Sequence, residues 1–287
     1  MEMVIQARGL CKSYGAKTAL DNINLEVGAG RIVGLIGPNG AGKTTLLKGI
    51  LGLANMEGEL RVLGLNPFRE RVNLLQDVCF IADTAILPRW IKVSEALEYV
   101  AGVHPKFNRE KALGFLEKTN IKLTDKVKNL SKGMVTQLHL ALIMAIDSRL
   151  LVLDEPTLGL DIIYRKQFYE SLLNDYYDAN KTIVITTHQV EEIEGILTDL
   201  IFIDDGRVIL QMDMDEVPRQ FFELQVDASN KDLASALDPM HSRAILGGWS
   251  MIFENVDPSR LAPLGRVSTP SIADLFVAKM QAKPSLR

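Results

Sequence analysis

Cysteine is scarce in this sequence, with only Cys11 and Cys79 among its 287 residues. The two lie far apart and have neither metal-ligand nor redox spacing, which favours a reducing compartment where both remain thiols. Long apolar runs are also missing, because the longest, LHLALIMAI at 138–146, is far short of the ~20 residues of a membrane span. The opening residues, MEMVIQARGLCKSY, lack the regions of a signal peptide. We therefore expect a soluble, cytoplasmic protein.

Strong charge of either sign is missing as well. The formal net charge is −4, which gives no general attraction to nucleic acid or to anionic lipid. Any such partner would have to be met by a local patch, so the net charge by itself decides nothing. We expect no nucleic-acid partner and no direct lipid binding. A composition of 47% hydrophobic and 24% charged residues is that of a globular protein, and the length suggests one large domain or two smaller ones.

Strands and helices alternate along much of the chain. NINLEV at 22–27 alternates polar and apolar residues, as a half-buried strand does. RIVGLI at 31–36 is nearly continuously apolar, as are LLVLD at 150–154 and TIVITT at 182–187, which indicates buried strands. A helix is predicted from Thr44. This alternation predicts an α/β domain with a largely parallel sheet.

Two further regions have different patterns. Helix signals dominate residues 84–148, which predicts a helical subdomain. Near the C-terminus, Ser271 and Asp274 have the spacing of a capping box and predict a last helix. We predict a nucleotide-binding domain at 1–215 and a small α+β domain at 216–287, whose role stays open.

The strongest motif is GPNGAGKT at 37–44, which matches the P-loop pattern and lies between a predicted buried strand and a helix. Glycines allow backbone N–H groups to close around phosphate oxygens, and a helix N-terminus adds a positive dipole. Lys43 is predicted to reach the β and γ phosphates, and Thr44 to offer its hydroxyl to Mg²⁺. The predicted nucleotide-binding residues of this loop are Gly37, Pro38, Asn39, Gly40, Ala41, Gly42, Lys43, Thr44 and Thr45.

Two acids follow a predicted strand in LLVLDEPT at 150–157. They lie at its C-terminal end, where open α/β sheets bind their ligands. Asp154 is predicted to hold Mg²⁺ through water, and Glu155 to polarise an attacking water as a general base. The alternative is a pair of helix-start acids without a catalytic role.

Other candidates depend on this P-loop context. His188 follows the strand at 182–187 and is predicted to contact the γ-phosphate, although a lone histidine is more often structural. Tyr14 could stack on adenine or serve only in packing. Ser131 and Gly133 precede an apolar helical pattern, and by itself a serine there is usually an N-cap.

Five motifs occur in an order typical of one family. GPNGAGKTT, LSKGM, VLDEPT, GLD at 159–161 and TTH at 186–188 make residues 3 to 215 resemble the nucleotide-binding domain of ABC transporters. The resemblance is strongest to ATPase subunits of bacterial exporters whose membrane subunits are separate chains. It implies a P-loop NTPase core with a mostly parallel sheet, an antiparallel β subdomain and a helical subdomain.

The resemblance also implies roles for single residues. It places Tyr14 against adenine, and it places Ser131 and Gly133 at the γ-phosphate of ATP held by the other subunit of a dimer. Asp161 would lie in the loop that couples the two sites. The further implied roles are phosphate contact for Lys43 and His188, metal binding for Thr44 and Asp154, and water activation for Glu155.

The sequence departs from the family pattern at two places. The signature, usually LSGGQ, is here Leu130-Ser131-Lys132-Gly133-Met134. The position at which the family usually has a metal-contacting Gln aligns with Asp83. This acid leaves a metal role possible, and whether it alters the coupling of nucleotide to the membrane subunit stays open.

The expected function is that of an ATPase, with ATP and Mg²⁺ as cofactors, that dimerises on ATP with a second copy or a paralogous subunit. It would power an exporter through a separate polytopic permease, on the cytoplasmic face of the cell membrane. The main alternative is a soluble ABC-class ATPase acting in translation or on DNA, although such proteins usually carry two such domains or a long coiled coil. A GTPase would need Asn-Lys-x-Asp, and 180–183 reads NKTI. A binding module without catalysis is disfavoured by Glu155 and His188.

Overall fold

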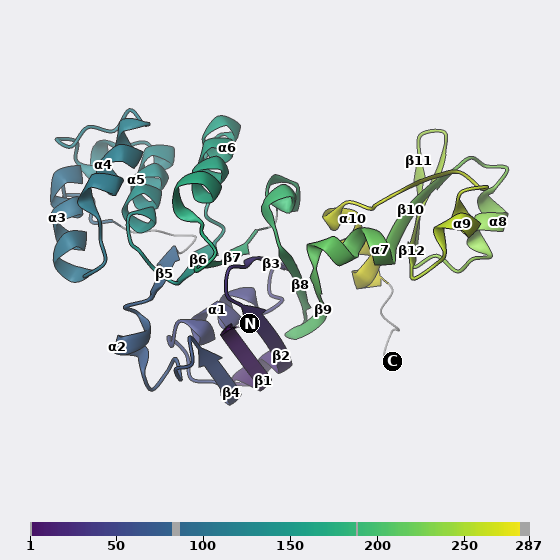
Figure 1. The fold of residues 1–287 in the computed structure, drawn as a ribbon, viewed down its shortest axis with the longest axis horizontal. Coiled ribbons are helices and arrows are strands. Elements are labelled where there is room, and N and C mark those ends of the chain that lie inside the picture. Colours follow the sequence, from purple (N-terminus) through teal and green to yellow (C-terminus); the bar gives the residue numbers. More distant parts are fainter. Residues whose placement is uncertain (1, 82–86, 188, 282–287) are drawn as a thin grey trace.

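The computed structural model describes residues 2–81, 87–187 and 189–281. Figure 1 shows a central region of two sheets, with helices α3–α5 at one side and a third sheet at the other. The mixed α/β architecture with a parallel sheet confirms the predicted fold class. Asp83 and His188, both predicted site residues, lie outside the described residues. In the described ranges, no helix combines the length and the apolar character that crossing a bilayer requires.

A six-stranded sheet forms the centre of the protein, with the order β5-β6-β7-β3-β8-β9. The first five strands of that order are parallel, and β9 pairs antiparallel with β8. The strands are β3 (Ile32–Ile36), β5 (Val78–Ile81), β6 (Leu150–Asp154), β7 (Thr182–Thr186), β8 (Asp199–Asp204) and β9 (Arg207–Asp213). Every residue of β3, β6 and β7 is buried, which confirms the strands predicted from continuous apolar runs.

An antiparallel sheet, ordered β2-β1-β4, packs beneath the central one. Its strands are β1 (Met3–Tyr14), β2 (Lys17–Gly28) and β4 (Glu57–Val62). Helix α1 (Lys43–Ile50) shares one hydrophobic core with both sheets. Strand β2 starts five residues before the alternating pattern at 22–27 because its first part pairs with β1.

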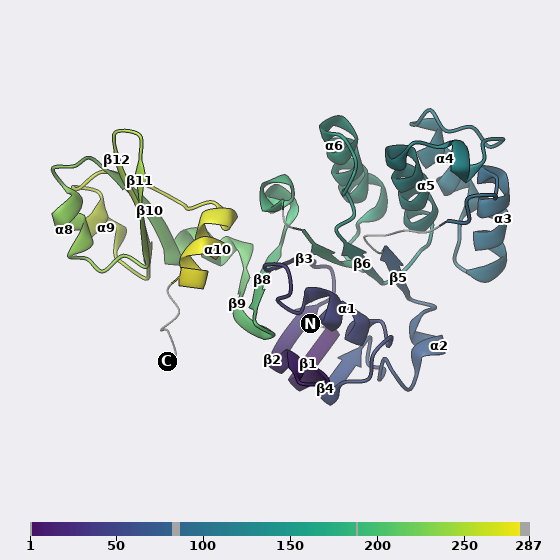
Figure 2. The ribbon, with the colours of Figure 1, turned by 180° about the vertical axis from the view of Figure 1, so that it is seen from behind.

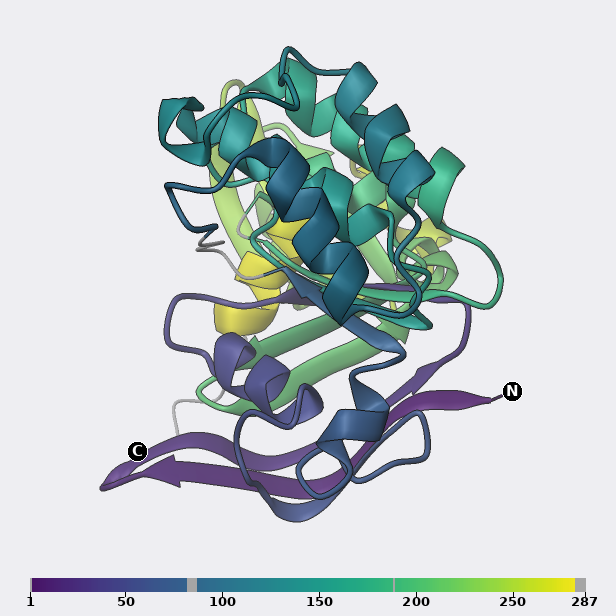
Figure 3. The same ribbon diagram turned by 90° about the vertical axis from the view of Figure 1, so that its left-hand side faces the viewer.

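The helical subdomain consists mainly of α3 (Val93–Val103), α4 (Arg109–Glu117) and α5 (Lys132–Met144), which pack around their own core. Figure 3 looks onto these helices, with the antiparallel sheet below. After β6 the chain forms α6 (Ile162–Ser171), which continues as the π-helix η2 (Leu172–Tyr176). The short helices are α2 (Arg71–Leu74), η1 (Val127–Asn129), η3 (Val190–Glu192), η4 (Glu194–Ile196) and η5 (Met214–Glu216).

The C-terminal part contains a four-stranded antiparallel sheet, ordered β11-β12-β10-β13, with its own hydrophobic core. Its strands are β10 (Phe221–Val226), β11 (His241–Ile245), β12 (Gly248–Glu254) and β13 (Arg266–Ser268). The helices of this part are α7 (Val217–Gln220), α8 (Lys231–Ser235), α9 (Pro258–Leu261) and α10 (Ile272–Gln281).

Helix α10 links this sheet to the rest of the protein, and Figure 2 shows it between the two. Ser271 Oγ accepts a hydrogen bond from the Asp274 N–H at 3.1 Å, so Ser271 caps the helix as predicted. Ile272 is fully buried in the core of the central sheet, and the Phe276 ring packs edge-on against Phe202 with centroids 5.0 Å apart. The last helix therefore packs on the first domain, and the boundary at 215/216 stays a prediction.

Candidate active site

The loop from Gly37 to Gly42 joins the end of β3 to the start of α1. Gly42 has φ +107°, in the left-handed region, and a Cβ built on it would lie 2.6 Å from the Ala19 carbonyl oxygen. Only glycine fits there, because any side chain would meet both backbone strain and the neighbouring strand.

Lys43 folds back over this loop. Its ammonium donates hydrogen bonds to the carbonyl oxygens of Gly37 at 2.6 Å and Pro38 at 3.2 Å, and the residue is only 8% exposed. Burial lowers the pKa of Lys43, and the negative charges of Glu155 and Asp154 act in the opposite direction. A partly desolvated cation held beside the loop is suited to bind phosphate oxygens.

Asp154 ends strand β6, and its buried carboxylate connects three elements. One oxygen accepts a hydrogen bond from Thr44 Oγ1 at 3.3 Å, and the other accepts one from Thr186 Oγ1. A hydroxyl beside a carboxylate is the oxygen donor set that Mg²⁺ prefers, usually completed by waters and substrate phosphates. In the described residues no cluster of three or more acids, histidines and cysteines could hold a metal alone. The residues therefore fit Mg²⁺ bound together with phosphate.

Glu155 has a left-handed backbone, with φ +50°. Its N–H donates to the Thr186 carbonyl oxygen at 3.1 Å and to Thr186 Oγ1 at 3.2 Å. A non-glycine residue in this conformation is strained and persists only where its surroundings hold it. Thr186 thus orients both acids. This threonine lies within the TTH motif, where no local signal assigned it a role.

Most of the predicted nucleotide-binding residues line one cavity of about 310 Å³. Tyr14 lies at its edge with half of its surface exposed. Lys17 and Ala19, from the start of β2, also line it, although no motif marked them. Gly37 and Ala41 of the loop are buried and do not line the cavity. The full lining is Tyr14, Lys17, Ala19, Pro38, Asn39, Gly40, Gly42, Lys43, Thr44, Thr45, Asp154 and Glu155.

Ser131, Gly133 and Asp161 do not line this cavity. Ser131 Oγ accepts the Met134 N–H at 3.2 Å and so caps α5. Asp161 Oδ1 accepts the N–H groups of Ile163 at 3.0 Å and Tyr164 at 3.1 Å and so caps α6. Both residues have the ordinary capping role, and their predicted contribution to an ATP site stays a prediction.

A glycine-rich loop between a buried strand and a helix, a buried lysine over it, and two acids after a neighbouring strand define a P-loop nucleoside-triphosphatase. Comparisons with known proteins give the particular family. The model of the ABC transporter family matches residues 20–158. This chain belongs to the ATP-binding subunits of ABC transporters and is an ATPase.

Several relatives support this assignment. The Nod factor export ATP-binding protein I of Cupriavidus metallidurans is 32% identical, over 91% of this chain and 89% of the relative. Its counterpart in Sinorhizobium fredii is 30% identical, over 96% of this chain and 85% of the relative. The bacitracin transport ATP-binding protein BcrA of Bacillus licheniformis is 30% identical, over 80% of this chain and 78% of the relative.

Solved structures share the fold. An ATP-binding subunit of an ABC transporter superposes with a TM-score of 0.69 at 24% identity, over 75% of this chain and 92% of that one. A dimeric ATP-binding cassette in a post-hydrolysis state, bound to ADP and Pi, superposes with a TM-score of 0.63 at 23% identity. The superposition covers 73% of this chain and 98% of that one. The match extends over about three quarters of this chain in both comparisons.

Proposed function

We propose that this ATPase dimerises on ATP, binds Mg²⁺ with it, and powers an exporter whose permease is a separate membrane chain. The observation that carries the proposal is the division of the site. The P-loop and both acids line one cavity, whereas the cap of α5, at Ser131, lies outside it. A second copy, or a paralogous subunit, would bring its own α5 to that cavity.

Each side chain then has a distinct task in hydrolysis. The Lys43 ammonium and the loop N–H groups bind the phosphates, and the Tyr14 ring stacks on the adenine. Thr44 and Asp154 would hold Mg²⁺, which when bound would supply positive charge to offset the charge that develops on the phosphates. Glu155 orients the attacking water and accepts its proton as the oxygen attacks phosphorus and the bond to ADP breaks. Ser131 of the other subunit would donate to the γ-phosphate.

The exporter role is supported by relatives named for the export of Nod factor and the transport of bacitracin. Because the described helices include none that could span a membrane, the transport path would belong to a partner. We therefore place the protein on the cytoplasmic face of the cell membrane, attached through that partner. The transported substrate stays open.

The test is purification of the tagged chain from detergent-solubilised membranes, followed by identification of polytopic proteins that accompany it. The Glu155→Gln variant, with ATP and Mg²⁺, should increase their recovery, since it binds ATP without turnover. A chain recovered only from the soluble fraction, with ribosomes or with DNA, would instead support the soluble alternative and overturn the exporter proposal.

A further inference from the structure

The start of α5 meets the loop between β6 and α6 at a glycine. Gly159 has φ +87°, and a Cβ built on it would lie 3.1 Å from Lys132 Cε, 3.4 Å from Cδ and 3.6 Å from Nζ. The Lys132 side chain therefore lies along the Gly159 backbone. A Cβ on Gly133 would lie 3.7 Å from the Gly159 carbonyl oxygen, so the two backbones also approach each other closely.

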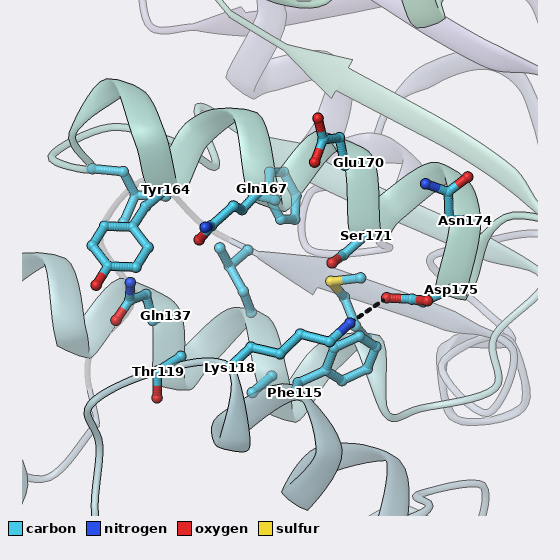
Figure 4. Close-up of a pocket in the computed structure, with 15 residues that line it drawn as sticks. Phe115, Lys118, Thr119, Gln137, Tyr164, Gln167, Glu170, Ser171, Asn174 and Asp175 are labelled. Atoms are coloured by element: carbon cyan, nitrogen blue, oxygen red, sulfur yellow. Dashed lines mark hydrogen bonds and ion pairs between the residues drawn. The ribbon is translucent and has the colours of Figure 1, made fainter.

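The helical subdomain is otherwise packed incompletely against α6. A cavity of about 390 Å³ lies between α4, α5 and α6, and Figure 4 shows Gln137 and Gln167 at it. At the far end, Lys118 Nζ pairs with Asp175 of the π-helix η2 at 2.9 Å (Figure 4). Gly159 precedes α6 and Asp175 is in η2, so these contacts lie at opposite ends of the cavity. Leu130, Met134 and Val135 pack the α5 start on the helical core, and the Lys132 contact joins that start to the loop between β6 and α6.

Lysine is an unfavourable choice for this position. It is the first residue of α5, where the positive end of the helix dipole opposes a cation, and the first turn has no acid. Among the described residues the Lys132 ammonium has no hydrogen bond or ion pair to compensate. The aliphatic part of the side chain, rather than its charge, makes the contact with Gly159.

We propose that Lys132 is a positioning residue: it braces the start of α5 against Gly159 of the same chain and so holds Ser131 in place for ATP bound by the other subunit. This inference rests on the proposed sharing of sites between subunits. It gives a physical role to the lysine that replaces a glycine of the usual LSGGQ signature.

The first test compares kcat and ATP affinity in Lys132 variants. Lys132→Ala should lower kcat about three- to tenfold, a range typical of residues that act through another. ATP affinity should be unchanged, since the P-loop is intact. Lys132→Met retains the aliphatic chain and should restore kcat. Lys128→Ala is a matched control, because Lys128 is an exposed lysine just before the signature. If Lys132→Met is as slow as Lys132→Ala, the charge is responsible and the proposal is wrong.

A double-mutant cycle tests the contact itself. In Gly159→Ala the new methyl group meets Lys132, whereas in Gly159→Ala/Lys132→Ala its three nearest neighbours are gone. Left-handed strain is the same in both backgrounds, so the Gly159→Ala loss of kcat should shrink when Lys132 is absent. Additive effects, in variants with unchanged thermal midpoints, would overturn the brace.

Epistasis with Ser131 tests the direction of the effect. In a Ser131→Ala background, single-turnover rates should show no further loss from Lys132→Ala, because the residue to be positioned is missing. An equal loss in both backgrounds would place the effect elsewhere and overturn the proposal. If the unmodified chain does not dimerise on ATP, the proposed function is contradicted instead. Failure of the Lys132 proposal and failure of the proposed function are therefore distinguishable.

Discussion

Gly42 and Gly40 offer a matched pair for testing how the P-loop is built. Both have left-handed backbones, with φ +107° and +86°. A methyl group on Gly42 would lie 2.6 Å from the Ala19 carbonyl oxygen and 2.9 Å from Leu20 Cδ2. One on Gly40 would meet no described atom within 4 Å. The two substitutions thus share backbone strain, but only Gly42→Ala adds a steric clash.

The expected losses of stability follow from these two contributions. Left-handed strain costs about 1–2 kcal/mol for a residue with a side chain. Overpacking against β2 adds about 1–3 kcal/mol, because the nearest atom is backbone and relaxes poorly. Gly42→Ala should therefore be the more destabilising of the two by about 1–3 kcal/mol, which is the overpacking contribution alone.

Guanidinium unfolding followed by circular dichroism, without nucleotide, measures this difference. Gly42→Ala should also weaken ATP binding, since any shift of residue 42 moves Lys43. Equal losses of stability in the two variants would refute the reasoning, because they would mean that the close approach to Ala19 carries no cost.

Three further predictions concern the acids and a buried histidine. Glu155→Gln should retain ATP binding, lose turnover and accumulate an ATP-bound dimer in gel filtration. Thr186→Val should raise the Mg²⁺ concentration needed for hydrolysis, because Asp154 loses a donor; Thr182→Val, in the same buried strand but away from the cavity, should leave it unchanged. Burial lowers the pKa of His139 to about 4. As the pH is lowered from 6.5 to 4, the unfolded chain therefore takes up a proton that the folded chain excludes. The free energy of unfolding should decrease over this range, and it should decrease less in His139→Leu.

The sequence predicted those parts of the site that lie within short motifs. The P-loop, Lys43 and Thr44 are contiguous, and their chemistry requires those residue types at that spacing. Asp154 and Glu155 follow a strand whose burial is evident from its composition. These residues line one cavity because parallel strands end at the same edge of the sheet.

What sequence reasoning missed depends on contacts between distant residues. Thr186 is 32 residues from Asp154, and only the pairing of β6 with β7 brings the hydroxyl to the carboxylate. Likewise, the Phe276 ring of helix α10 packs on Phe202 of the central sheet. Neither contact has a local sequence signal.

The most direct test of the account mixes two inactive variants. Lys43→Ala removes the phosphate-binding cation, and Ser131→Ala removes the donor proposed to serve the other subunit. Loss of one oriented donor to a developing anion typically costs ~10² to 10³ in rate, so each variant alone should be nearly inactive. In a mixed dimer one site has both defects and the other has none. If sites are shared between subunits, ATPase activity should return in part on mixing; if activity stays absent although subunit exchange is demonstrated, each chain closes its own site and the account is contradicted.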